Sequence, residues 1–96
     1  MDNNIINIEE YAREGKKVPP HATYRIRIDK DNYETTSPAP TGAAILGLAG
    51  KTPATYHLYL HIKGGQTQAI AAETPVDLTE PGVERFSTMK IENTEG

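Results

Sequence analysis

The chain has 96 residues, a formal net charge of −3, no cysteine and a hydrophobic content of 36%. This length fits one small domain with a thin core, and the lack of cysteine excludes disulfides, thiolate metal sites and thiol catalysis. The acidic balance argues against nucleic-acid binding, and no apolar run approaches the roughly 20 residues of a membrane span. Since the first residues also lack the basic start of a signal peptide, we expect a soluble, cytoplasmic protein.

Residues 1–21 form a leader that differs in pattern from the rest of the chain. Ile5, Ile8 and Ala12 recur at helical spacing, and a glycine and two prolines then end the pattern. A helix of about ten residues is marginal alone in water, so we expect the leader to order by docking on a partner. Ile5, Ile8 and Tyr11 are its candidate partner-binding residues. Packing on its own sheet, self-association with another copy and a disordered tail remain open alternatives.

The pattern changes at about residue 22 from helical spacing to strict alternation. Apolar Tyr24, Ile26 and Ile28 alternate with Arg25 and Arg27, which is typical of a half-buried strand. The aspartates and asparagine that follow predict a hairpin loop, because these residues tolerate turn geometry. A second strand is predicted for residues 33–36.

A helix is predicted for residues 42–49. Thr41 is a good N-cap, and Gly50 stands where a helix-terminating glycine belongs. Ile45, Leu46 and Ala49 share one face and should point into the core.

Three more strands follow the helix. The alternation of Tyr56, Leu58, Leu60 and Ile62 predicts one at residues 56–62, and a glycine-rich turn separates it from a polar strand at 66–70. After an irregular connection, the last strand is predicted at residues 83–89. This order predicts an α+β domain over residues 22–90, a ubiquitin-like β-grasp fold (ββαββ-turn-β) with one helix packed on one face of a mixed sheet. Its first and last strands should be parallel neighbours, and residues 91–96 should form a flexible tail.

Several stretches, taken together and in order, resemble the bacterial multiubiquitin family. They are YRIRID at 24–29, PTG at 40–42, LAGKTP at 48–53, GGQ at 64–66, EPGVERF at 80–86 and TEG at 94–96, with IEEYA and the double proline of the leader. The resemblance implies a protein modifier that serves with an adenylating activating enzyme, a conjugating enzyme and a deconjugating protease, and a role in phage defence. It implies no cofactor and no enzymatic activity of the chain itself.

The resemblance places the chemistry at the C-terminal Gly96. A glycine without a side chain can be threaded through a narrow channel and adopts any backbone angle, which suits a carboxylate that must reach a nucleotide. We expect conjugation of Gly96 to target proteins, and we expect the activating enzyme to hold the preceding tail, Glu92, Asn93, Thr94 and Glu95. A sulfur carrier with a C-terminal thiocarboxylate and a non-covalent interaction module are the alternatives.

Alternation also predicts a second surface, on the sheet face away from the helix. The first, last and third strands should bring together one patch of partner-binding side chains: Arg25, Arg27, His57, Tyr59, His61 and Arg85. Tyrosine and arginine are enriched in interface hot spots, but a solvated charged face is an equally good reading. His57 and His61 would lie about 13 Å apart along one strand, too far to share a metal ion.

Overall fold

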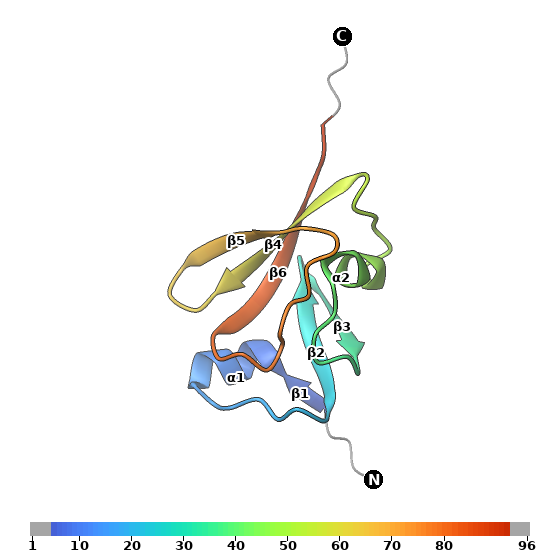
Figure 1. The fold of residues 1–96 in the computed structure, drawn as a ribbon. Coiled ribbons are helices and arrows are strands. Elements are labelled where there is room, and N and C mark those ends of the chain that lie inside the picture. Colours follow the sequence, from blue (N-terminus) through green and yellow to red (C-terminus); the bar gives the residue numbers. More distant parts are fainter. Residues whose placement is uncertain (1–4, 93–96) are drawn as a thin grey trace.

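The computed structural model describes residues 5–92, which form a mixed sheet of six strands and two short helices (Figure 1). The strand order is β1-β2-β6-β4-β5, with β3 paired to the other edge of β2. This is an α+β fold of the ubiquitin-like β-grasp class, as the sequence predicts. The elements are β1 (Ile5–Asn7), α1 (Ile8–Glu14), β2 (Thr23–Ile28), β3 (Asp31–Thr35), α2 (Gly42–Leu48), β4 (Tyr56–Ile62), β5 (Gln66–Ile70) and β6 (Val83–Lys90).

The centre of the sheet is formed by β2, β6 and β4. The strands β4 and β6 pair antiparallel along nearly their whole length, whereas β2 and β6 pair in parallel at a single register, Ile28 with Phe86. Parallel neighbours need a long connection, and here it holds the hairpin, α2 and the β4–β5 pair. The predicted parallel arrangement of these two strands is confirmed, but their contact is much shorter than expected.

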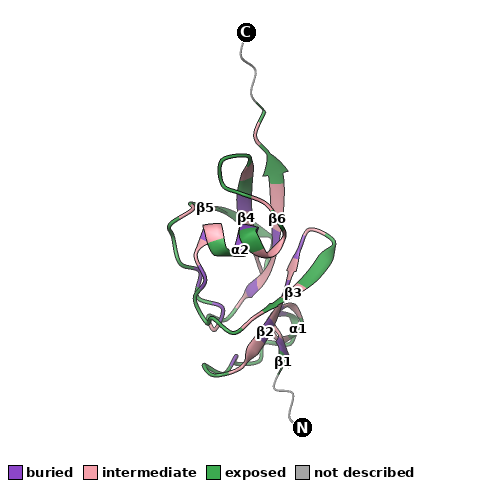
Figure 2. Cartoon of the chain, turned by 90° about the vertical axis from the view of Figure 1, so that its right-hand side faces the viewer, coloured by how far each residue is buried: buried purple, intermediate pink, exposed green. Residues whose placement is uncertain are grey.

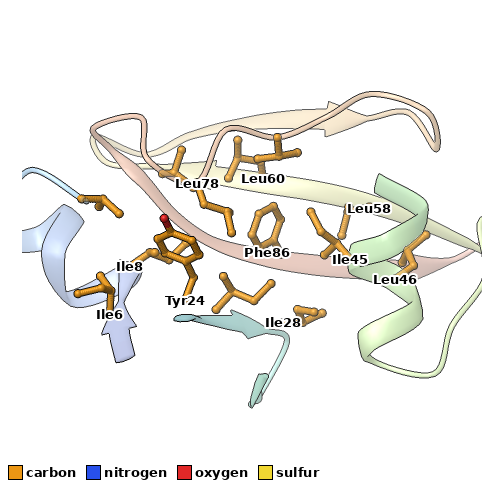
Figure 3. Close-up of a cluster of buried hydrophobic side chains, with 14 residues drawn as sticks. Ile6, Ile8, Tyr24, Ile28, Ile45, Leu46, Leu58, Leu60, Leu78 and Phe86 are labelled. Atoms are coloured by element: carbon orange, nitrogen blue, oxygen red, sulfur yellow. The ribbon is translucent and has the colours of Figure 1, made fainter. Parts of the chain in front are cut away.

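One face of the sheet is apolar and forms the core with α2. Phe86 lies near the middle of the cluster, between Leu60 and Leu78 on one side and Tyr24 and Ile28 on the other (Figure 3). Tyr24, Phe86 and Leu78 are fully buried. The alternation in β2 and β4 is therefore produced by a single buried face, as the sequence pattern indicates.

The helix α2 begins and ends where its sequence signals stand. The Thr41 side chain accepts a hydrogen bond from the backbone N–H of Ala44 at 3.2 Å, and Gly50 adopts a left-handed φ of 73° just after the helix. Ile45 and Leu46 are buried against the sheet. The segment after β5 runs beside the entry to this helix, where Val76 and Leu78 donate backbone hydrogen bonds to the carbonyls of Pro40 and Pro38.

The described part of the leader, residues 5–21, is part of the domain, which corrects the expectation that the leader stands outside it. Strand β1 pairs in parallel with the first half of β2, on the edge that β6 occupies further along. The helix α1 then lies between the diverging starts of β2 and β6 (Figure 1). Ile6, Ile8, Ala12 and Val18 are all buried there. The short leader helix is stable because it completes the core and does not float in water.

Two local features fix the leader in place. Asn7 caps α1 by accepting a hydrogen bond from the N–H of Glu10 at 3.1 Å, and Gly15 ends the helix with a φ of 69°. Further along, the hydroxyl of Tyr24 donates to the carbonyl oxygen of Pro19 at 2.7 Å. Burial, together with the charge of Asp77, raises the pKa of Tyr24, so the hydroxyl remains protonated as a donor.

Candidate functional site

The predicted conjugation site, Gly96, lies outside the described residues, as do Asn93, Thr94 and Glu95 of the predicted tail. The described chain leaves the sheet at the end of β6. Its last ladder pair joins Tyr56 and Lys90, and the N–H of Ile91 then donates to the carbonyl of Thr55 at 2.9 Å. Glu92 is exposed, and the end of β6 is exposed too (Figure 2). The described chain therefore ends at an exposed residue, two positions after a strand that is paired up to Lys90.

The last strand is tied to the first hairpin by Asp29. Its carboxylate accepts two hydrogen bonds from Thr88, from the backbone N–H at 2.9 Å and from the hydroxyl at 2.6 Å. The Asp29 N–H donates to the carbonyl of Phe86 at 2.9 Å, and Lys51 lies 3.9 Å from the carboxylate. Asp29 has a left-handed φ of 57°, which aspartate tolerates better than most residues. The side chain therefore extends the β2–β6 pairing beyond Ile28.

The outward sheet face gathers the predicted residues in two groups. On β4 and β6, the register places His61 opposite Arg85 and Tyr59 opposite Ser87. A hydrogen bond of 2.8 Å joins His61 Nε2 and Ser87 Oγ, and the rings of His57 and Tyr59 lie 6.2 Å apart. Arg25 and Arg27 share the same face but lie on β2, beyond β6.

Two arginines of the predicted partner-binding patch form ion pairs with carboxylates. Arg25 pairs with Glu34 on β3 at 3.0 Å, and Arg27 pairs with Glu9 on α1 at 3.3 Å. Glu9 also binds Arg13 at 2.9 Å. Two of the three arginines are therefore matched by carboxylates that come from the neighbouring hairpin strand and from the leader. The sequence pattern shows neither the register of β3 nor the packing of α1, so it could not predict these two carboxylate partners.

His61 has an unusual electrostatic environment among the residues of this face. Burial lowers its pKa from the ordinary value of 6.5, and the charge of Arg85 lowers it further. Glu84 opposes the shift, and Arg27 adds to it. At neutral pH the ring is therefore uncharged. One ring nitrogen then donates and the other accepts, and the hydroxyl oxygen of Thr67 lies 3.5 Å from Nδ1.

The three partner-binding candidates of the leader have different positions. Ile8 is 1% exposed and belongs to the core, so a partner cannot contact it in this fold. Tyr11 is half-buried against the same core, beneath the ammonium of Lys16 at 5.3 Å. Ile5, at 37%, is the exposed member of the three. The assignment of Ile8 as a surface residue is therefore wrong, and its burial explains its apolar character.

Within residues 5–92, no group of three or more histidine, aspartate or glutamate side chains is arranged to hold a metal ion. His57 lies opposite Met89 and His61 lies opposite Arg85, so the two histidines have different cross-strand neighbours. In the same described part of the chain, no helix is long and apolar enough to cross a membrane.

Comparison with known proteins gives one match. The family model described as multiubiquitin matches residues 24–91, which run from the start of β2 to just past the end of β6. The match leaves out β1 and α1. Searches of curated proteins and of solved structures gave no match.

Proposed function

Because the chain belongs to the multiubiquitin family, we propose that it is a protein modifier, activated at Gly96 by an adenylating enzyme and conjugated to target proteins. A conjugating enzyme and a deconjugating protease would act with it, and phage defence is the process in which we expect it to serve. The observation that carries the proposal is the match of a ubiquitin-like family to the whole of β2 to β6.

The proposed reaction needs only a free carboxylate on Gly96. A carboxylate oxygen attacks the α-phosphorus of ATP and releases pyrophosphate, which gives an acyl-adenylate. A thiolate of the enzyme then attacks the carbonyl carbon and releases AMP, which leaves a thioester that an amine or hydroxyl of the target can accept. The chain contributes the carboxylate that becomes activated and a surface for docking, and the enzymes supply the catalytic groups.

The end of β6 supports this role. The strand is paired with β4 up to Lys90, is anchored through Thr88 to Asp29, and is exposed at Met89 and Lys90. Residues 93–96 add at most about 13 Å of chain at roughly 3.3 Å per residue. An enzyme that takes the carboxylate of Gly96 must therefore sit close to this end of the sheet.

We assign the docking of these enzymes to the outward face of β4 and β6, from Met89 near the tail to Arg85 near the start of β6. Met89 is 59% exposed and lies opposite His57, with Tyr59 next along β4. Arg85 stands on the same face without an ion-pair partner among residues 5–92. An exposed methionine, an aromatic ring and an arginine are the side chains that interfaces favour. Arg25 and Arg27 are occupied by their carboxylates and contribute less.

The test is incubation with ATP, an adenylating enzyme and a conjugating enzyme of the multiubiquitin pathway, and cell lysate, followed by intact-mass analysis. Conjugates that disappear in a variant lacking residues 93–96 support the proposal. A shift of about 16 Da, as oxygen is replaced by sulfur, would instead identify a sulfur carrier. An unchanged mass with intact binding to a partner would identify a non-covalent module.

Tyr59→Ala and Arg85→Ala separate docking from chemistry. Both should lower the rate of conjugate formation at limiting enzyme and leave the reaction possible at saturating enzyme. The control is Asn32→Ala, an exposed residue on β3, which should leave the rate unchanged.

A further inference from the structure

Three strands of the described sheet are paired on one side only: β1 and β3 with β2, and β5 with β4. The strand β1 has three residues, and the two longer outer strands, β3 and β5, differ in charge. An outer strand presents unpaired N–H and C=O groups that can join another strand, and proteins commonly protect it with charge, proline or a bulge.

Charge protects β3. Its sequence, DNYET, holds two carboxylates, and Ser37-Pro38 follows shortly after it. Two copies paired antiparallel about Tyr33 would place Asn32 of one beside Glu34 of the other and concentrate four carboxylates along one seam. Such like charges across a strand pair oppose association.

No such protection exists on β5. Its sequence, QTQAI, has no charge and no proline, its pairing with β4 is regular, and Gln66, Thr67, Gln68 and Ala69 are exposed. The start of α2 approaches the strand at its Ile70 end, where Leu46 and Ile70 both line a hollow of about 190 Å³. The edge from Gln66 to Ala69 is therefore exposed as well as uncharged.

The strand is also complementary to itself. In an antiparallel pair about a two-fold axis at Gln68, this residue faces its own copy, Thr67 faces Ala69, and Gln66 faces Ile70. Lys63 lies in the turn before the strand, where its ammonium donates to the carbonyl of Arg13 at 3.3 Å, and Glu73 lies in the turn after it. The seam itself therefore places no like charges opposite each other.

We propose that β5 is a self-association edge, through which two copies of this chain join their sheets into one continuous sheet. This inference is independent of conjugation at Gly96. A five-residue strand pair buries far less than the standard interface of about 1,600 Å², so the dimer is transient and depends on concentration. It forms where copies are held close together, because a second contact then becomes effectively intramolecular.

The experiment is a concentration series of the full chain, followed by amide chemical shifts and by sedimentation. We expect concentration-dependent shifts centred on Gln66–Ile70 and not on β3. Gln68→Lys places two ammonium groups face to face at the axis and should weaken self-association about tenfold, which corresponds to about 1.4 kcal/mol. Gln68→Thr, an uncharged strand-forming residue at the same position, should retain it. Asn32→Lys adds the same charge to β3 and should change nothing.

The two-fold axis has a test of its own. A mixture of Gln68→Lys and Gln68→Glu chains should associate more strongly than either variant alone, because opposite charges then meet at the axis. Unchanged association of Gln68→Lys, or the absence of any concentration-dependent shift in β5, would overturn the proposal. Shifts confined to Asp31–Thr35 would place the interface on the other edge and overturn it equally.

Discussion

Asp29 and Thr88 stand 59 positions apart in the chain and share two hydrogen bonds, at 2.9 and 2.6 Å. Asp29 directly follows β2, the first strand of the hairpin, and Thr88 lies on β6, shortly before the described chain ends. Since β2 and β6 share a single ladder register, this side chain supplies much of the polar connection between them. The two hydrogen bonds to Asp29 therefore fix the position of β6, the strand that precedes the C-terminal residues.

Thr88→Val should therefore destabilise the fold. The substitution keeps the size of the side chain and removes the 2.6 Å hydrogen bond to a carboxylate, so we expect a loss of about 1–2 kcal/mol in the free energy of unfolding, measured with urea. Thr67→Val is the matched control, because Thr67 is exposed and its hydroxyl lies 3.5 Å from His61. Equal losses in the two variants would contradict the role given to Asp29.

The leader provides a second prediction. Ile8→Ala removes a fully buried side chain and should cost about 2–4 kcal/mol in the free energy of unfolding. Ile5→Ala, only three residues away at an exposed position, should cost less than about 1 kcal/mol. Deletion of residues 1–21 should lower the unfolding midpoint strongly. A leader-deleted chain as stable as the full one would mean that α1 and β1 do not belong to the core.

Glu9 allows a test of the ion pairs on the outward face. Its side chain is 12% exposed and faces both Arg13 and Arg27, and the Nε of Arg27 is buried without a hydrogen-bond partner among the described residues. Glu9→Gln should cost about 1 kcal/mol, because it leaves a half-buried guanidinium without its counter-charge. Glu34→Gln breaks a more exposed pair with Arg25 and should cost less than about 0.5 kcal/mol. The comparison is made by urea unfolding at constant ionic strength.

The lowered pKa of His61 predicts a dependence of stability on pH. In the folded state the ring resists protonation, whereas in the unfolded state it takes up a proton near 6.5. The unfolded state therefore binds more protons, and the free energy of unfolding falls as the pH drops from above 6.5 through the lower folded pKa. His61→Gln should remove this contribution. NMR titration of the His61 ring should give a folded pKa below 6.5, and a value above it would contradict the assignment.

The sequence predicted the central elements well because their signals are local. The alternating strand predicted at residues 56–62 and the polar strand predicted at 66–70 coincide with β4 and β5, and Thr41 and Gly50 mark the two ends of α2 as expected. The residues that point inward along β2 follow from the same alternation. These features depend on neighbours in the chain, which the sequence gives directly.

The remaining features depend on contacts between distant segments. The burial of Ile8 requires the gap between β2 and β6, and that gap exists only because their pairing is limited to one register. The neutralisation of Arg27 in turn requires α1 to lie beside the sheet. A short amphipathic leader looks the same in sequence whether it covers its own core or another protein, so its role could not be predicted.

The most direct test of the proposed function is formation of an ATP-dependent thioester between this chain and an adenylating enzyme of the multiubiquitin pathway. The account predicts an adduct on non-reducing gels that thiol reagents release, that requires ATP, and that is lost when residues 93–96 are deleted while urea unfolding remains unchanged. No adduct with the folded chain, under conditions in which the same enzyme charges another modifier of the family, would contradict it.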